Sequence, residues 1–162
     1  MQKKWRAGIV GATGMVGQRL ATLLDNHPYF DVTVLAASPR SAGKSYSEAV
    51  EGRWKMSVPV PSYAADMTVI SATDIDTLKQ NCDFVFCAVD MKKDEIRALE
   101  ERYAKAEIPV VSNNSAHRAT PDVPMVIPEI NDDHLQVIES QRKRLGTKKG
   151  FIAVKPNCSI QC

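Results

Sequence analysis

The sequence predicts a doubly wound α/β domain, Rossmann-like, with a mostly parallel sheet and helices on both faces. Apolar runs of strand length alternate with amphipathic helical runs along the chain. A glycine-rich turn joins the first such strand to the first helix, and no repeat or low-complexity segment interrupts the order. The 162 residues are 44% hydrophobic and 25% charged, which is the composition of an ordinary globular domain with a single core.

The first three elements form a β-α-β unit. Residues 6–10 are short, apolar and interrupted by glycine, as expected of a buried strand, and residues 15–26 carry leucine and valine at helical spacing. His27 and Pro28 close the helix, and residues 32–37 read as a second buried strand. A strand, a helix and a second strand in this order predict parallel pairing.

The next segment, residues 38–66, is rich in serine, proline, glycine and charge and has weak periodicity. It predicts a long excursion over the surface, to which no helix or strand is assigned.

Regular alternation returns after residue 66. Residues 82–89 are the most convincing central strand, and Asp94 and Glu95 suit the positive end of the helix that follows. The expected strands are 68–70, 82–89, 109–112 and 151–154, with an apolar segment at 125–128 and helices near 93–106 and 132–144.

Composition excludes several classes of function. The formal net charge is only +2, and the charges are mixed along the chain, which disfavours nucleic-acid or membrane binding. The N-terminus lacks the apolar stretch of a signal peptide, so the four cysteines indicate reduced thiols in a cytoplasmic protein. Cys82 and Cys87 lie five residues apart in an apolar strand, on opposite faces, and cannot chelate one metal. No metal site is expected.

Residues 11–17 form the glycine-rich turn that predicts nucleotide binding. Glycines between a strand and a helix permit a tight turn and let a pyrophosphate approach backbone N–H groups. The match to G-x-G-x-x-G is a variant, because Ala12 takes the middle position when Gly14 and Gly17 are aligned. The alternative is a turn that only packs the helix on the strand; the flanking elements favour nucleotide binding.

The residues at the end of the second predicted strand indicate which nucleotide the domain would bind. An NAD site places a carboxylate there for the ribose 2′-hydroxyl, whereas this chain has Ser38, Arg40 and Ser41. Hydroxyls and a guanidinium suit a 2′-phosphate, so the sequence favours NADP. The alternative is a solvated loop with an isolated arginine.

Cys158 is a candidate nucleophile, because it follows a predicted strand at a turn where a helix N-terminus would stabilise a thiolate. The alternative is a structural cysteine packed as a small apolar residue. Cys162 could share a helical face with Cys158, but no second pair of ligands completes a zinc site.

Together these motifs resemble aspartate-semialdehyde dehydrogenase, in the branch found in archaea, fungi and some bacteria. The resemblance spans nearly the whole chain in order. It rests on residues 11–19 and 35–44, on the Ser-Asn-Asn-Ser-Ala-His-Arg segment at 112–118, on residues 121–124 and 128–131, and on Pro-Asn-Cys-Ser at 156–159. Ile160 and Gln161 depart slightly from the family, which often has threonine after Cys-Ser.

The resemblance implies a reaction and a set of site residues. The Cys158 thiolate would displace phosphate from aspartyl-β-phosphate to give a thioester, and NADPH would reduce it to aspartate semialdehyde, the branch point toward lysine, methionine and threonine. Arg118 would bind the substrate phosphate and Asn157 would help to hold the acyl group. The residues expected at the cofactor are Gly11, Thr13, Gly14, Met15, Val16, Gly17, Ser38, Arg40, Ser41, Cys87 and Ala88.

The resemblance also implies a second, catalytic and dimer-forming domain downstream of the nucleophile. We therefore expect residues 1–157 to be an NADP-binding domain, 158–162 to begin a truncated catalytic domain, and the parent protein to be a homodimer or homotetramer. Such a fragment would bind the cofactor without turnover. Malonyl-CoA reductase, a close relative, the more distant N-acetyl-glutamyl-phosphate reductase, and a non-catalytic nucleotide-binding module remain alternatives.

Overall fold

The computed structural model describes residues 3–157, and the chain divides after Asp90 into two compact units. The pairings between the described strands of each unit are parallel, and helices separate successive strands along the chain. The predicted doubly wound α/β class is confirmed.

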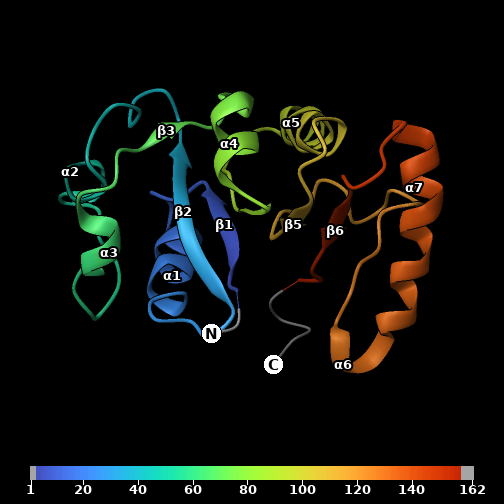
Figure 1. The fold of residues 1–162 in the computed structure, drawn as a ribbon, viewed down its shortest axis with the longest axis horizontal. Helices are drawn as coiled ribbons and strands as arrows, with labels where there is room; N and C mark the ends of the chain where they lie inside the picture. Colours follow the sequence, from blue (N-terminus) through green and yellow to red (C-terminus); the bar gives the residue numbers. More distant parts are fainter. Residues whose placement is uncertain (1–2, 158–162) are drawn as a thin grey trace. The chain divides into compact units, whose positions relative to one another are not determined.

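The first unit holds a four-stranded parallel sheet in the order β3-β2-β1-β4 (Figure 1). Its elements are β1 (Trp5–Val10), α1 (Met15–Leu23), β2 (Phe30–Ala37), α2 (Tyr46–Val50), α3 (Ser62–Ala65), β3 (Ile70–Ser71), α4 (Ile75–Asn81) and β4 (Phe84–Cys87).

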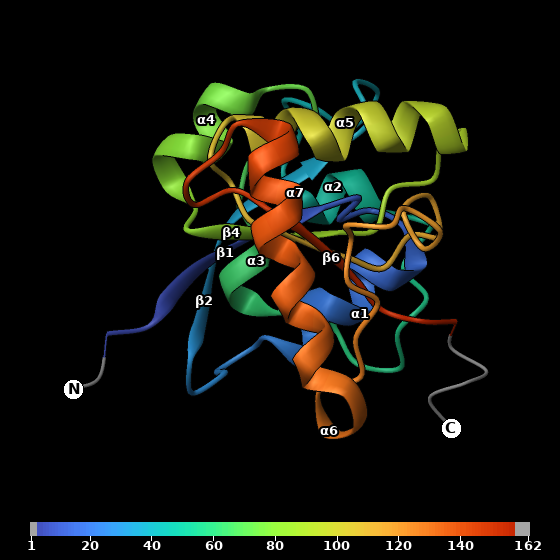
Figure 2. The ribbon, with the colours of Figure 1, turned by 90° about the vertical axis from the view of Figure 1, so that its right-hand side faces the viewer.

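Two crossovers of this unit run in opposite directions. The chain passes from β1 to β2 through α1, and it passes back across the sheet from β3 to β4 through α4. Because such connections are right-handed, the two helices cover opposite faces of the sheet, as Figure 2 shows. The strand order reverses between β1 and β4, and a doubly wound sheet binds its ligand at the carboxyl ends of the strands around that point.

The segment at 38–66 differs from the expected surface excursion. It contains α2 and α3, and Tyr46, the first residue of α2, is fully buried in a core with Ile9 and Leu35. A capping box between Ser45 and Glu48 starts α2. The helix has only five residues, too few to produce a helical period in the sequence.

The second unit pairs β5 (Val110–Ser112) with β6 (Ile152–Val154), in parallel. Its helices are α5 (Lys93–Lys105), α6 (Pro128–Asn131), the 3₁₀ segment η1 (Asp132–Val137) and α7 (Ile138–Leu145). The single helix expected near 132–144 is therefore a 3₁₀ segment followed by an α-helix. Gly146 ends α7 in the left-handed conformation, with φ 71°.

A carboxylate holds the loop that enters β6. Glu107 accepts hydrogen bonds from the backbone N–H groups of Lys148, Lys149 and Gly150, at 2.9, 2.6 and 2.8 Å. A Cβ on Gly150 would lie 1.8 Å from the carbonyl oxygen of Ala104, so only glycine fits this approach. None of the helices within residues 3–157 has the length and apolar character needed to cross a membrane.

Candidate functional site

The glycine turn lies at the point where the strand order reverses. Gly11 has φ +85°, and a Cβ there would lie 2.3 Å from the carbonyl oxygen of Ala88 at the end of β4. The N–H groups of Gly11 and Ala12 both donate to the carbonyl of Ala36 in β2, at 2.8 and 3.0 Å. The turn is therefore fixed to both neighbouring strands at their carboxyl ends.

The first turn of α1 follows directly. Gly14 is its N-cap, and a Cβ on Gly17 would lie 2.2 Å from the carbonyl oxygen of Gly11. This close approach packs the helix against the turn. Met15 and Val16 are exposed at the helix start, where backbone N–H groups have no partner within the helix and favour an anion.

The end of β4 completes this edge. Ala88 donates its N–H to the carbonyl of Val10 at 2.8 Å and lies against Gly11, whereas Cys87 is fully buried. Cys82 is also buried, and burial raises the pKa of its thiol to about 11. Cys82 is a free thiol.

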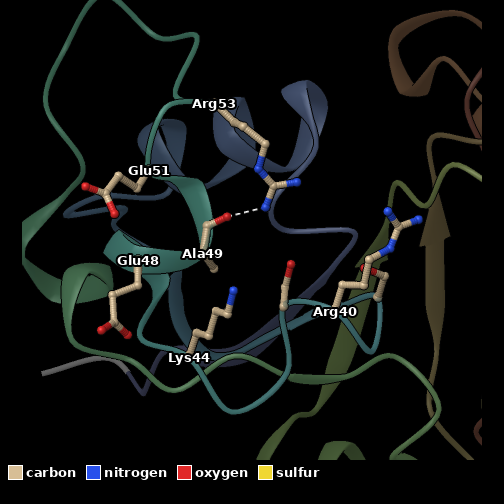
Figure 3. A pocket seen from close by; sticks show the side chains of 8 residues that line it. Arg40, Lys44, Glu48, Ala49, Glu51 and Arg53 are labelled. Carbon is tan, nitrogen blue, oxygen red and sulfur yellow. Dashed lines mark hydrogen bonds between the residues drawn. The ribbon is translucent and has the colours of Figure 1, made fainter.

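An open pocket of about 440 Å³ lies beyond the end of β2 (Figure 3). The structure brings the predicted residues Ser38, Arg40 and Ser41 together with cationic and acidic side chains from α2 and from the segments on either side of it. The lining residues are Ser38, Arg40, Ser41, Lys44, Glu48, Ala49, Glu51 and Arg53.

The charges around this pocket are separated. The Lys44 amine and the Arg53 guanidinium point toward the same space, and the Glu48 and Glu51 carboxylates lie on the other side of α2 (Figure 3). The Glu48 carboxylate accepts the N–H and the hydroxyl of Ser45, both at 2.9 Å, and these bonds lower its pKa. The pocket therefore presents cations and hydroxyls, which suit a phosphate.

Sequence reasoning missed Lys44 and Arg53 as pocket residues. The density of cationic residues across 38–53 was the available signal. It carried little weight because the segment showed no periodicity that would have placed those residues together.

In the second unit, the predicted substrate residue Arg118 contacts the segment that precedes the predicted nucleophile. Its Nε donates to the carbonyl of Lys155 at 3.2 Å and its Nη2 to the carbonyl of Pro156 at 3.5 Å. Asn157 follows directly and is exposed. The structure thus brings Arg118 beside the chain neighbours of Asn157. Cys158, like Cys162, lies outside the described residues.

A buried polar cluster supports the loop that carries Arg118. Glu100 of α5 is fully buried and accepts the Ser112 hydroxyl at 2.5 Å and the Asn114 side-chain amide at 3.0 Å. The ring of His117, also buried, places Nε2 4.0 Å from the second Glu100 oxygen. Sequence reasoning missed this cluster, although a carboxylate on the same helix face as Ile96 and the other apolar residues of α5 was a usable signal.

Among residues 3–157, no three histidine, cysteine or acidic side chains gather in a group that could hold a metal ion. These residues can bind anions at the glycine turn, at Arg118 and at the pocket beyond β2. We call this pocket the cationic pocket, after Arg40, Lys44 and Arg53.

A doubly wound sheet with a glycine turn at its switch point defines a dinucleotide-binding domain of the Rossmann class. The comparison with known families then places the chain more narrowly. Residues 6–138 match the family described as semialdehyde dehydrogenase, NAD binding domain, and the chain belongs to this family.

Three of the similar proteins are aspartate-semialdehyde dehydrogenases. The chain is 43% identical to that of Archaeoglobus fulgidus over 96% of its own length and 43% of the relative's. It is 46% identical to that of Methanothermobacter thermautotrophicus over 94% of its own length and 42% of the relative's. The crystal structure of the Candida albicans enzyme with NADP superposes with a TM-score of 0.83 at 38% identity, covering 97% of this chain and 44% of that one. The chain thus spans less than half the length of these relatives.

Proposed function

We propose that the full-length protein reduces L-aspartyl-4-phosphate to L-aspartate 4-semialdehyde with NADPH and releases phosphate, as a step toward lysine, methionine and threonine. Family membership and the named relatives support this reaction. The observation that carries the proposal is the contact of Arg118 with Lys155 and Pro156, because it brings a cation beside the segment that leads to Cys158.

The residues of the first unit fit a dinucleotide that carries a 2′-phosphate. Gly11 and Gly17 let the turn pack closely against Ala88 and against the first turn of α1, and the start of α1 offers N–H groups to a pyrophosphate. Ser38, Arg40 and Ser41, with Lys44 and Arg53, would hold the 2′-phosphate. When bound, NADPH supplies the hydride for the reduction.

The residues of the second unit would prepare the acyl group. Arg118 would bind the substrate phosphate, and Asn157 would orient the acyl carbonyl. The Cys158 thiolate would attack the carbonyl carbon; a carbon–sulfur bond forms, the carbon–oxygen bond to phosphate breaks, and phosphate leaves with the electron pair. A thioester is a better hydride acceptor than a carboxylate, which explains the need for a nucleophile.

The test is a substrate comparison in the full-length protein. We expect turnover with aspartyl phosphate and NADPH, and none with malonyl-CoA. Cys158→Ala should abolish turnover and leave the Kd for NADP unchanged, since the cofactor residues lie elsewhere. Preference for malonyl-CoA, or turnover by the Cys158→Ala variant, would contradict the proposal.

A further inference from the structure

Gln18 is a buried polar residue of α1, and it bonds the glycine turn to a distant segment. Its side chain is only 1% exposed. The side-chain Nε2 donates to the carbonyls of Thr13 and Arg53, both at 3.0 Å, and Oε1 accepts the N–H of Lys55 at 2.8 Å. Both amide hydrogens and the carbonyl oxygen therefore have partners, so replacing the amide leaves three part-buried backbone groups without these hydrogen bonds.

A second side chain makes a similar connection. The Tyr46 hydroxyl, fully buried, donates to the carbonyl of Ala12 at 2.8 Å. The side chains of Tyr46 and Gln18 thus hold the carbonyls of Ala12 and Thr13. Tyr46 belongs to the segment 46–55, and Gln18 is hydrogen-bonded to the same segment. These residues include part of the lining of the cationic pocket.

Arg53 is the residue through which this connection reaches the pocket. It lies in a turn outside any helix or strand, after Gly52 with φ +69°, and its N–H donates to the carbonyl of Val50 at 2.8 Å. Its guanidinium hydrogen-bonds the carbonyl of Ala49, another lining residue (Figure 3). The bonds from Gln18 to Arg53 and Lys55 fix this turn and with it the origin of the Arg53 side chain.

We propose that Gln18 is a positioning residue for cofactor choice: through the backbone of Arg53, it holds a cation in the pocket that would receive the 2′-phosphate. The same amide fixes the glycine turn, so the pyrophosphate turn and the 2′-phosphate pocket keep a constant separation. This inference rests on the proposed use of NADP. Gln18 itself touches neither phosphate; its effect on NADP passes through Arg53.

The experiment measures the Kd of NADP and of NAD for four forms of the full-length protein: wild type, Arg53→Met, Gln18→Met and the double variant. Arg53→Met should weaken the binding of NADP about tenfold, the effect of losing one charge-assisted contact, and leave the Kd of NAD unchanged. Gln18→Met should reduce the preference for NADP by a similar factor. The double variant should lose little more affinity for NADP than either single variant, because both substitutions act on the same cation.

Gln141 of α7 supplies a matched control. It is also fully buried, its Nε2 donates to the carbonyls of Asp122 and Ile152 at 2.9 Å, and its Oε1 accepts the N–H of Ile152 at 2.6 Å. It does not line the cationic pocket. Gln141→Met should lower Tm much as Gln18→Met does and leave the ratio of the two Kd values unchanged.

The outcomes separate the inference from the proposed function. If the wild type does not prefer NADP, the proposed cofactor fails and the inference fails with it. If the wild type prefers NADP but Gln18→Met weakens both cofactors equally, or its effect adds fully to that of Arg53→Met, only the inference is overturned. Should Gln18→Met not fold, Arg53→Met decides alone: an unchanged preference for NADP overturns the inference.

Discussion

Arg40 is exposed at the end of β2, where a carboxylate would select NAD. It lies on one side of the pocket with its guanidinium pointing away from Lys44, whereas the Lys44 and Arg53 side chains point toward each other from opposite sides (Figure 3). The proposed 2′-phosphate would thus meet cations from separate segments of the first unit, and each should add to affinity for NADP without affecting NAD.

Arg40→Ala should weaken NADP binding and leave NAD binding nearly unchanged. Losing a hydrogen bond to a charged group typically costs about 1.5–3 kcal/mol, roughly ten- to hundredfold in Kd. Titration of both cofactors by calorimetry measures this. Lys79→Ala, which removes an exposed cation of α4 that does not line the pocket, is the control and should change neither Kd. Equal weakening of both cofactors by Arg40→Ala would be inconsistent with a 2′-phosphate contact.

Arg118→Ala should raise the KM for phosphate and for the acyl phosphate in the full-length protein and leave the Kd of NADP intact. The guanidinium would contact the substrate phosphate, and no described contact joins it to the predicted cofactor residues. Steady-state kinetics in both reaction directions measures the effect, and NADP binding reports on the fold. An unchanged phosphate dependence would assign Arg118 to holding the backbone of Lys155 and Pro156 alone.

At the scale of elements, helix and strand ends are held by a few side-chain-to-backbone bonds. Glu107 is a clear case: it adopts φ 67°, outside α5, and its carboxylate collects three backbone N–H groups ahead of β6. An anion in such a concave row of donors is strongly bonded.

Glu107→Gln should therefore destabilise the fold by about 1–3 kcal/mol, since the amide keeps the shape of the side chain but removes the charge and offers one acceptor oxygen. Urea unfolding monitored by circular dichroism gives the change. Glu129→Gln, an exposed position in the first turn of α6, serves as the control and should cost less than about 1 kcal/mol. A loss at Glu107 no larger than at Glu129 would show that the three bonds contribute little.

The elements that the sequence predicted well are those with strong local signals. β1, α1 and β2 follow from apolar runs around a glycine turn, although α1 ends at Leu23, before Asn26, which has φ 54°. α4 was missed because its only apolar residues are Ile75 and Leu78, and Asp74, whose side chain accepts from the N–H of Thr77, provides the helix start.

The residues of the candidate site likewise fall into those that the sequence predicts and those that it does not. The glycine turn and Ser38, Arg40 and Ser41 were predictable, because a motif or a strand end marks them. Gln18 and Arg53 were not, since their contact joins residues 35 positions apart through a segment without periodicity. Local sequence reports burial and turns, whereas the partners of a side-chain amide are set by tertiary folding.

At the scale of the whole molecule, the buried Cys82 thiol links stability to alkaline pH. Burial raises its pKa from 9.0 to about 11 in the folded protein. The thiol therefore favours folding at pH values below 9, and this contribution is lost as the pH rises toward 11, because the unfolded chain loses its proton first.

The difference in Tm between wild type and Cys82→Ala should therefore shift against the wild type between pH 9 and pH 11. Tyr46 and Tyr63 also have raised pKa values because of burial, but they are present in both proteins and cancel in the comparison. Calorimetric scans across this range supply the data. Parallel Tm curves for the two proteins would show that the thiol titrates in the folded state as it does in the unfolded one.

The two bonds from Arg118 to the carbonyls of Lys155 and Pro156 have a thermodynamic consequence. A free arginine side chain gives up as much as about 2 kcal/mol of rotamer entropy when it is immobilised on a ligand. Here that conformational freedom is already lost when the chain folds. An oxyanion that docks on this guanidinium therefore meets a preorganised partner, and its association is opposed by less entropy than capture by a mobile side chain would be.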